Sequence, residues 1–382
     1  MRCFAKTIRD TRKRGVAQDK GTMQPVIAHL IVIVVGVVAV SRPSLADFTF
    51  GAPVNLKSVM PVLDPAHEST DCFSFDGLEM YFGSDRPGGC GKFDLWVLKR
   101  ASLDDAWGPP ENLGPVVNSS KNDSVVSISA DGLTLYFNSD RPGGYGGFDI
   151  YTTTRTTKND LWKPPVNMGP KINTSAGDGS PWVSANGLEL YFASWRLGGF
   201  GGGDIFVTKR ATGNGPWGDP ANLSPMVNSG YDEDTASLSP DGLLLIISSG
   251  SRPGGYGGGD VWMTRRATLS DPWQAAVNLG PIINTDTDDG SPRISPDGRM
   301  LYFWSGRSGD WENYQATILP IVDFNADKKV DLVDLVMLID DWGKSESVCD
   351  IGPYAWGDGK VDIEDLKVFM AEWEKENPPA QP

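Results

Sequence analysis

The sequence has little histidine. It contains two His in 382 residues, and one of them, His29, lies in an N-terminal segment that we expect to be removed. Zinc centres of the common kind depend on His and Cys ligands. A Ser-His-Asp triad needs a His that a neighbouring carboxylate orients, and the surroundings of His67 offer no such arrangement. The composition therefore argues against both kinds of site.

Cysteine is too scarce for a disulfide framework. Four Cys are present, and three of them, Cys72, Cys90 and Cys349, follow the N-terminal segment. Cys72 and Cys90 lie in one sequence repeat and are close enough in the chain to pair after export. Their pairing stays open at the level of the sequence.

The sequence also lacks a long hydrophobic segment that predicts a membrane span. The apolar run at 26–40 is short, basic residues precede it, and the small residues SLA follow at 44–46. This order is typical of a signal peptide with its cleavage site. Residues 1–46 are therefore predicted to be a signal peptide, with Met23 as a second candidate start. We expect the mature chain to be secreted, either outside the cell or into a periplasm.

Basic charge is low. From Asp47 onward the chain holds 26 Lys and Arg against 47 Asp and Glu, a net charge of −21. Binding to nucleic acid depends on Lys and Arg that neutralise phosphates. The charge therefore argues against a nucleic-acid partner.

Repetition dominates what the sequence does contain. An Asp-Gly or Asn-Gly pair recurs five times, at spacings of 55, 55, 55 and 56 residues. A fixed period of this size indicates stacked or radially arranged supersecondary units. The five pairs are Asp76-Gly77, Asp131-Gly132, Asn186-Gly187, Asp241-Gly242 and Asp297-Gly298.

Each repeat predicts four short antiparallel strands. In the second copy, residues 133–138 alternate in the manner of a half-buried strand. A glycine-rich loop at 139–147 leads to a further strand, and a short last strand follows a polar hairpin. Four such strands per ~55 residues are typical of a propeller blade. The fold class predicted for 47–320 is therefore an all-β, five-bladed propeller.

The two ends of the repeat region predict how the ring closes. Residues 50–56 resemble 107–113, the fourth strand of the first repeat, and the fifth repeat stops near Pro320 without that strand. The N-terminal segment is therefore predicted to supply the missing outer strand, which removes an exposed sheet edge.

The repeat motif resembles a known family. The pattern S-x-DG-x-x-LYF-x-SDRPGG-x-GG-x-DIY is similar to the repeats of TolB-like propellers, relatives of the WD-repeat group. This resemblance covers roughly 47–320 and implies a fold rather than a function.

The segment after the repeats predicts a calcium site. Oxygen-bearing side chains stand at loop positions 1, 3, 5, 9 and 12, where a hard cation needs its ligands. An amphipathic run at 335–339 follows and predicts a helix. The candidate ligands are Asp323, Asn325, Asp327, Asp331 and Asp334, with the backbone carbonyl of Lys329 at position 7.

A loop with Asp at position 12 and a helix on its C-terminal side resembles dockerin, the module that docks onto cohesin domains. The resemblance implies bound Ca²⁺ and a cohesin-like protein partner. Lys328 departs from it, because these loops prefer Gly at that tight turn. The module is predicted to span 321–375, ahead of a disordered tail at 376–382.

A second acidic loop fits the calcium pattern less well. Asp358, Asp362, Asp365 and the carbonyl of Lys360 suit positions 5, 9, 12 and 7. Counting back places Tyr354 at position 1 and Trp356 at position 3, neither of which is a carboxylate. Asp350 can take position 1 only across a four-residue insertion. The alternative for both loops is that the acids merely cap helices.

Three charged positions recur around the predicted ring. They form either an open ring of carboxylates or a set of Arg–carboxylate contacts that hold the loops, and we favour the second interpretation. The positions are an acid (Glu68, Asp123, Asp178, Glu233, Asp289), an Arg (Arg86, Arg141, Arg196, Arg252, Arg307) and an Asp that opens the third strand (Asp94, Asp149, Asp204, Asp260, with Asn313 in the last copy).

Residues that break the repeat are the better candidates for ligand binding. Four tryptophans, Trp182, Trp195, Trp304 and Trp311, are candidate platforms for stacking on a glycan, and ordinary packing is the alternative. A glycosidase needs a pair of carboxylates, and Asp310 and Glu312 are the notable unrepeated pair. No catalytic centre is evident.

The sequence thus predicts a secreted, non-catalytic binding or scaffolding protein with a calcium-dependent docking module. One alternative is a carbohydrate-active protein, a glycoside hydrolase or lectin-like accessory in polysaccharide degradation. The other is a TolB-like envelope protein.

Overall fold

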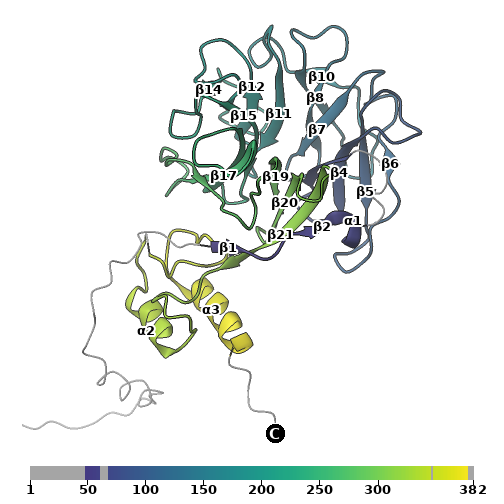
Figure 1. Ribbon diagram of the computed structural model, residues 1–382. Helices are drawn as coiled ribbons and strands as arrows, with labels where there is room; N and C mark the ends of the chain where they lie inside the picture. The colour runs from purple at the N-terminus through teal and green to yellow at the C-terminus, as the bar shows by residue number, and fades with distance from the viewer. Residues whose placement is uncertain (1–47, 61–67, 346, 377–382) are drawn as a thin grey trace, which may run out of the picture. The chain divides into compact units, whose positions relative to one another are not determined.

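The computed structural model describes residues 48–60, 68–345 and 347–376 (Figure 1). The predicted signal peptide, His67 and nearly all of the predicted tail lie outside these ranges. Within them, no helix has the length and apolar character needed to cross a membrane.

Four sheets of four antiparallel strands follow one another along the chain. The first three strands of each have six or seven residues, and the last is a two-residue strand. In chain order the strands are β3 (Glu68–Phe73), β4 (Glu79–Ser84), β5 (Asp94–Lys99) and β6 (Glu111–Asn112); β7 (Asp123–Ile128), β8 (Thr134–Ser139), β9 (Asp149–Thr154) and β10 (Val166–Asn167); β11 (Asp178–Val183), β12 (Glu189–Ser194), β13 (Asp204–Lys209) and β14 (Ala221–Asn222); and β15 (Asp232–Leu238), β16 (Leu244–Gly250), β17 (Gly259–Arg265) and β18 (Val277–Asn278).

The fifth sheet joins the two ends of the repeat region. Its strands are β19 (Asp289–Ile294), β20 (Met300–Ser305) and β21 (Glu312–Pro320), together with β1 (Phe48–Phe50) and β2 (Val54–Asn55) from the N-terminal side. β2 pairs with the first half of β21 and β1 with its second half. The first strands of the sheets contact one another in sequence, and β19 contacts β3. The chain is therefore a five-bladed β-propeller whose seam is closed by N-terminal strands.

The blades are buried on both faces because each packs against its neighbours. In β8, Leu135 and Phe137 face one hydrophobic cluster and Tyr136 faces another, and all three are at least 97% buried. Burial on both faces explains why the apolar residues of the second strands, such as Leu135, Tyr136 and Phe137, stand next to one another rather than alternating with polar residues.

The recurring charges hold the ring together. Asp178 is fully buried and accepts hydrogen bonds from the Thr174 amide (2.6 Å), the Ser194 hydroxyl (2.5 Å) and Arg196 Nη2 (2.7 Å). The Arg196 guanidinium also lies over the Phe206 ring, at 4.7 Å. The pairs Asp123–Arg141 and Asp289–Arg307 repeat this ion pair at 2.5 and 3.2 Å, and Glu233–Arg252 is longer at 3.9 Å.

Helices follow the propeller. α1 (Leu56–Val59) is one short turn beside the seam, whereas α2 (Leu332–Asp340) and α3 (Ile363–Glu376) lie after β21. α2 and α3 share a small core in which Leu338 and Phe369 are fully buried.

Replacing Asp178 by Ala is expected to lower the free energy of unfolding by about 3–5 kcal/mol, because it leaves a buried guanidinium without its carboxylate. Chemical denaturation measures the change. The exposed pair Lys171–Asp219 (3.2 Å) supplies the control, since Lys171→Ala should cost less than about 1 kcal/mol. Equal effects of the two substitutions would show that the ring of carboxylates is not structural.

Candidate metal centre and binding surfaces

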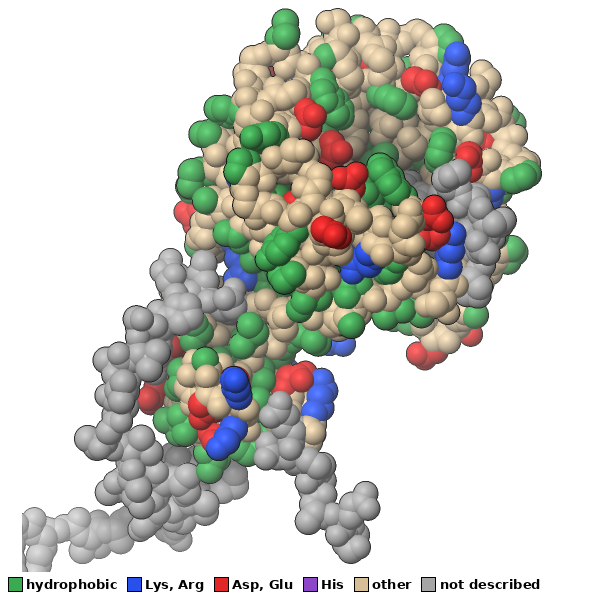
Figure 2. All heavy atoms as spheres, viewed as in Figure 1, with side chains coloured by type: hydrophobic (Ala, Val, Ile, Leu, Met, Phe, Trp, Pro, Cys, Tyr) green, Lys and Arg blue, Asp and Glu red, His purple; other side chains and the backbone are tan. Residues whose placement is uncertain are grey.

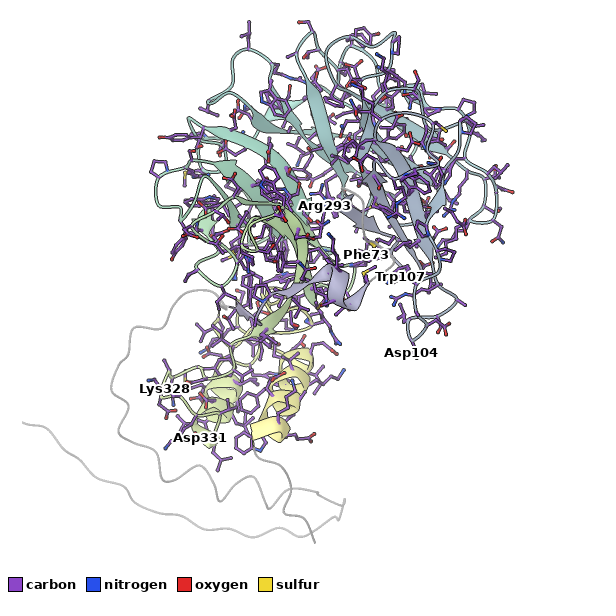
Figure 3. The ribbon with its side chains drawn as sticks, turned by 45° about the vertical axis from the view of Figure 1, so that its right-hand side comes forward. Phe73, Asp104, Trp107, Arg293, Lys328 and Asp331 are labelled. Atoms are coloured by element: carbon purple, nitrogen blue, oxygen red, sulfur yellow. The ribbon has the colours of Figure 1, made fainter. Side chains whose placement is uncertain are left out.

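The first acidic loop is organised by its own carboxylates. Asp323 accepts hydrogen bonds from the amides of Asp327 (3.1 Å) and Lys328 (2.7 Å), and the Asn325 side-chain oxygen accepts from Asp327 as well (2.8 Å). Lys328 and Asp331 lie in this loop, just before α2 (Figure 3). Position 1 of the loop therefore holds the amides of positions 5 and 6.

Asp334, at position 12, closes the same loop from the first turn of α2. It is fully buried and accepts from the amides of Phe324 (2.8 Å) and Asp331 (2.9 Å). Asp331 in turn caps α2 by accepting from the Val333 amide (2.8 Å). One carboxylate thus joins positions 2, 9 and 12.

The second loop repeats this set of bonds. Asp350 accepts from the amides of Asp358 and Gly359, both at 2.8 Å. Asp365, which is fully buried, accepts from the amides of Ile351 and Asp362, both at 2.6 Å. These four contacts match those of Asp323 and Asp334, and Asp365 accepts one more, from the Gly352 amide at 2.8 Å.

The matching contacts decide which residue holds the first position of the second loop. Asp350 occupies it, and residues 353–356 form an insertion of four residues between positions 1 and 5. Tyr354 and Trp356, the alternatives from simple counting, belong to the insertion. The sequence left both assignments open.

The oxygen atoms that could bind a metal are present in both loops, but their side chains do not converge on one point. Among the residues that the structure describes, no three His, Cys, Asp or Glu side chains converge into a metal-binding cluster. Burial, together with the nearby Asp365 and Asp358 carboxylates, raises the pKa of Asp350 to about 6, against the lowering effect of the backbone bonds from Asp358 and Gly359. Burial also raises the pKa values of Asp334 and Asp365. A divalent cation would relieve this crowding of negative charge, so the oxygen donors fit calcium chemically.

The two loops differ at two strained positions. At the first of them, Ala326 has φ +59° where the second loop has Gly357 at φ +80°. Lys328 has φ +70°, and its counterpart in the second loop is Gly359 at φ +96°. An L-residue in this left-handed region costs roughly 1 kcal/mol, which Gly avoids. Lys328 therefore strains the backbone of the first loop, and weaker metal binding there stays a prediction.

Lys328→Gly is expected to stabilise the first loop by about 1 kcal/mol and to tighten any metal bound there about fivefold. Calorimetric titration and thermal unfolding of the full chain measure the two effects. The reciprocal change Gly359→Lys should weaken the second loop by a similar factor. If Lys328→Gly changed neither quantity, backbone strain would not limit this loop.

An apolar face of α2 is exposed to solvent. Leu332, Val336 and Ile339 are 55%, 43% and 56% exposed and lie three or four residues apart, on one side of the helix. Trp342, one turn later, is 47% exposed. Figure 2 shows hydrophobic side chains at the surface of this helical segment. Such a face is typical of a protein-binding surface.

The four predicted tryptophans are not equivalent. Trp182 is half-buried between two hydrophobic clusters, with the Arg293 guanidinium over its ring, so that packing explains it. Trp195 is partly exposed over the glycine loop of its blade. Trp304 and Trp311 stack face to face, with ring centres 4.6 Å apart and planes 5° apart, and Trp311 is 69% exposed.

Three further exposed aromatic residues escaped the sequence reasoning. Tyr145, Phe200 and Tyr256 stand at the tips of the glycine loops, where Trp311 stands in the fifth blade, and each is about half exposed. Hydrogen bonds hold these loops, because Asp149 accepts from the Tyr145 amide at 2.6 Å and its counterparts Asp204 and Asp260 do the same. The recurrence of these aromatic residues at one loop position is a signal in the sequence, whereas the predicted ligand candidates are residues that break the repeat.

The remaining predicted candidates are dispersed. Glu312 forms an ion pair with Lys57 (2.9 Å), and Asp310 is exposed. Cys72 is buried and Cys90 exposed, and no disulfide joins them. Two clefts of about 650 and 670 Å³ flank the first blade, and none of the four predicted tryptophans lines them.

In comparisons with known proteins, no family model and no curated protein matches the chain. Among solved structures, TolB from Acinetobacter baumannii is 15% identical, over 66% of this chain and 54% of that protein, with a TM-score of 0.44. This chain therefore spans about half the length of that TolB.

Two glycoside hydrolases are similar to the same degree. The α-L-arabinofuranosidase from Podospora anserina in complex with cellotriose is 14% identical, over 72% of this chain and 98% of that one, with a TM-score of 0.45. A thermostable family-43 glycoside hydrolase is 11% identical, over 67% and 89%, with a TM-score of 0.46. The assignment of five blades rests on the sheet topology of the chain itself.

Proposed function

We propose that this chain is a secreted, non-catalytic binding protein, in which residues 321–376 form a calcium-stabilised docking module of the dockerin type. The observation that carries the proposal is the duplicated set of carboxylate–amide bonds in the two acidic loops. In each loop, positions 1 and 12 are held in place while further oxygen atoms stay available for a cation.

The exposed face of α2 supports the docking role. The exposure of Leu332, Val336 and Ile339 has an unfavourable hydration cost, which a partner surface would remove. The chemistry of this face fits an apolar protein surface, and a cohesin-like domain is the partner that the resemblance implies.

The metal part of the proposal is tested by titrating Ca²⁺ into the full chain and counting bound ions. Two ions are expected, with dissociation constants anywhere between roughly 10⁻⁷ and 10⁻³ M. Asp334→Asn should abolish one of them and Asp365→Asn the other. The exposed Asp219→Asn, on the propeller, is the control and should leave both. Failure to bind any Ca²⁺ at millimolar concentration contradicts the proposal.

The docking part is tested with a panel of purified cohesin domains. Val336→Asp and Ile339→Asp are each expected to weaken binding at least tenfold, because a carboxylate would be buried without a partner. Leu161→Asp changes an equally apolar residue that is 92% exposed on the propeller, and it should have no effect. Binding that is indifferent to all three substitutions would exclude α2 as the docking face.

Glycan recognition by the propeller is a second candidate function, which the Trp304–Trp311 stack favours. The inner ring supports the outer one at 4.6 Å, so the free face of Trp311 is presented rigidly. A flat aromatic face of this kind suits the apolar face of a sugar ring, and the acidic chain disfavours anionic ligands.

Binding of cellohexaose, xylohexaose, cellulose and xylan to the full chain tests this role. Trp311→Ala is expected to reduce the affinity about tenfold, whereas Leu161→Ala should not change it. An unchanged affinity in Trp311→Ala, or no binding of wild type to any of the four, counts against a glycan platform.

A further inference from the structure

The four-residue insertion in the second acidic loop does not pack within the helical module. Ala355 and Trp356 are 9% and 6% exposed, and both belong to a hydrophobic cluster of the propeller that includes Phe48 and Ile318. The core of the helical module is a separate cluster around Leu338. The insertion therefore extends the propeller core rather than the module core.

Two turns of the propeller receive the insertion. Trp356 Nε1 donates a hydrogen bond to Asp241 Oδ2 at 2.7 Å. Tyr354 stacks on Trp356 with ring centres 5.0 Å apart and planes 8° apart. Both rings lie over Gly298, where a Cβ atom would meet Tyr354 at 2.5 Å and Trp356 at 2.9 Å. The insertion thus packs closely against the Asp-Gly turns of blades four and five.

The same contact reaches the seam of the ring. The Phe48 ring meets Trp356 edge-on at 6.0 Å, and the Arg265 guanidinium lies 4.9 Å from the centre of the Phe48 ring. Phe48 begins β1, which pairs with the end of β21 from Ile318 to Pro320. β1 is short, so its three paired residues depend on side-chain burial to stay in place.

The two carboxylate oxygens of Asp241 accept hydrogen bonds from different parts of the chain. Oδ1 accepts from the Ser239 hydroxyl (2.5 Å) and the Leu243 amide (2.9 Å), which build the turn. Oδ2 accepts from Trp356 Nε1, which belongs to the insertion. In blade three, Asn186 fills the same turn with the same two Oδ1 bonds, at 2.8 and 2.9 Å. The turn therefore needs only one oxygen, and the second is available to the module.

From this geometry we propose that residues 353–356 are an intramolecular clamp, which locks the helical module onto the seam of the propeller and holds β1 in place. The clamp goes beyond the proposed docking function, and no contact in it involves a metal ligand side chain. It makes the propeller and the module one rigid unit, so that a partner on α2 is held at a fixed orientation to the propeller.

Hydrogen–deuterium exchange of the full chain, in the presence of a chelator, tests the clamp. Asp241→Asn keeps the turn oxygen but presents an NH₂ donor to the Trp356 donor. Loss of a hydrogen bond to a charged group is expected to accelerate exchange about ten- to a hundredfold, both at 354–357 and at 48–51. The amides of β8, in the second blade, should stay as protected as in wild type.

Asp131→Asn is the matched control. Asp131 makes the same two turn bonds in blade two, at 2.5 and 2.9 Å, and lies far from the insertion in the repeat. It should leave exchange at 48–51 and 354–357 unchanged. Trp356→Phe keeps an aromatic ring but removes the donor, and it should reproduce the effect of Asp241→Asn. Because this variant leaves the Asp241 turn unchanged, a misfolded turn could not explain its effect.

The clamp is overturned if Asp241→Asn and Trp356→Phe leave exchange at 48–51 as slow as in Asp131→Asn. It is also overturned if 354–357 exchange rapidly in the wild type. Because no metal is added, these results are separate from the calcium titration: the clamp can fail while both ions bind, and the ions can fail to bind while the clamp holds.

Discussion

In both the propeller and the helical module, carboxylates hold the loops by accepting hydrogen bonds from backbone amides. In the propeller, Asp149 and its counterparts hold the glycine loops, and Asp178 and its counterparts hold the connections between blades. In the helical module, Asp323 and Asp350 hold the acidic loops. A buried carboxylate must find donors or a cation, and each of these carboxylates has at least one backbone amide as a donor.

This constraint separates scaffold from candidate sites. Where an acid has both an Arg and backbone donors, as Asp178 does, little of its charge remains for a ligand. Where the donors are backbone amides alone, as for Asp350, burial raises the pKa and leaves an anion that a cation would stabilise. The same residue type thus serves two purposes, and its other partners decide which.

Neither departure from the repeat nor recurrence is a safe guide to which side chains are exposed. Trp182 departs from the repeat and yet packs in the core. Tyr145, Phe200 and Tyr256 recur and are nonetheless half exposed. Spacing along the chain identifies equivalent positions, whereas exposure depends on which neighbouring blade covers a side chain, and no local pattern encodes that.

The sequence by itself determined the five blades and the strand that closes them, because a fixed period and a missing fourth strand are local, countable patterns. It also predicted the oxygen donors of the first acidic loop, whose binding of a cation stays a prediction. Only the tertiary structure assigned Asp350 to the second loop and Trp356 to the propeller. Both assignments depend on contacts between residues that are eight and 115 positions apart in the chain, and such contacts are set by how folded segments meet rather than by their spacing in the sequence.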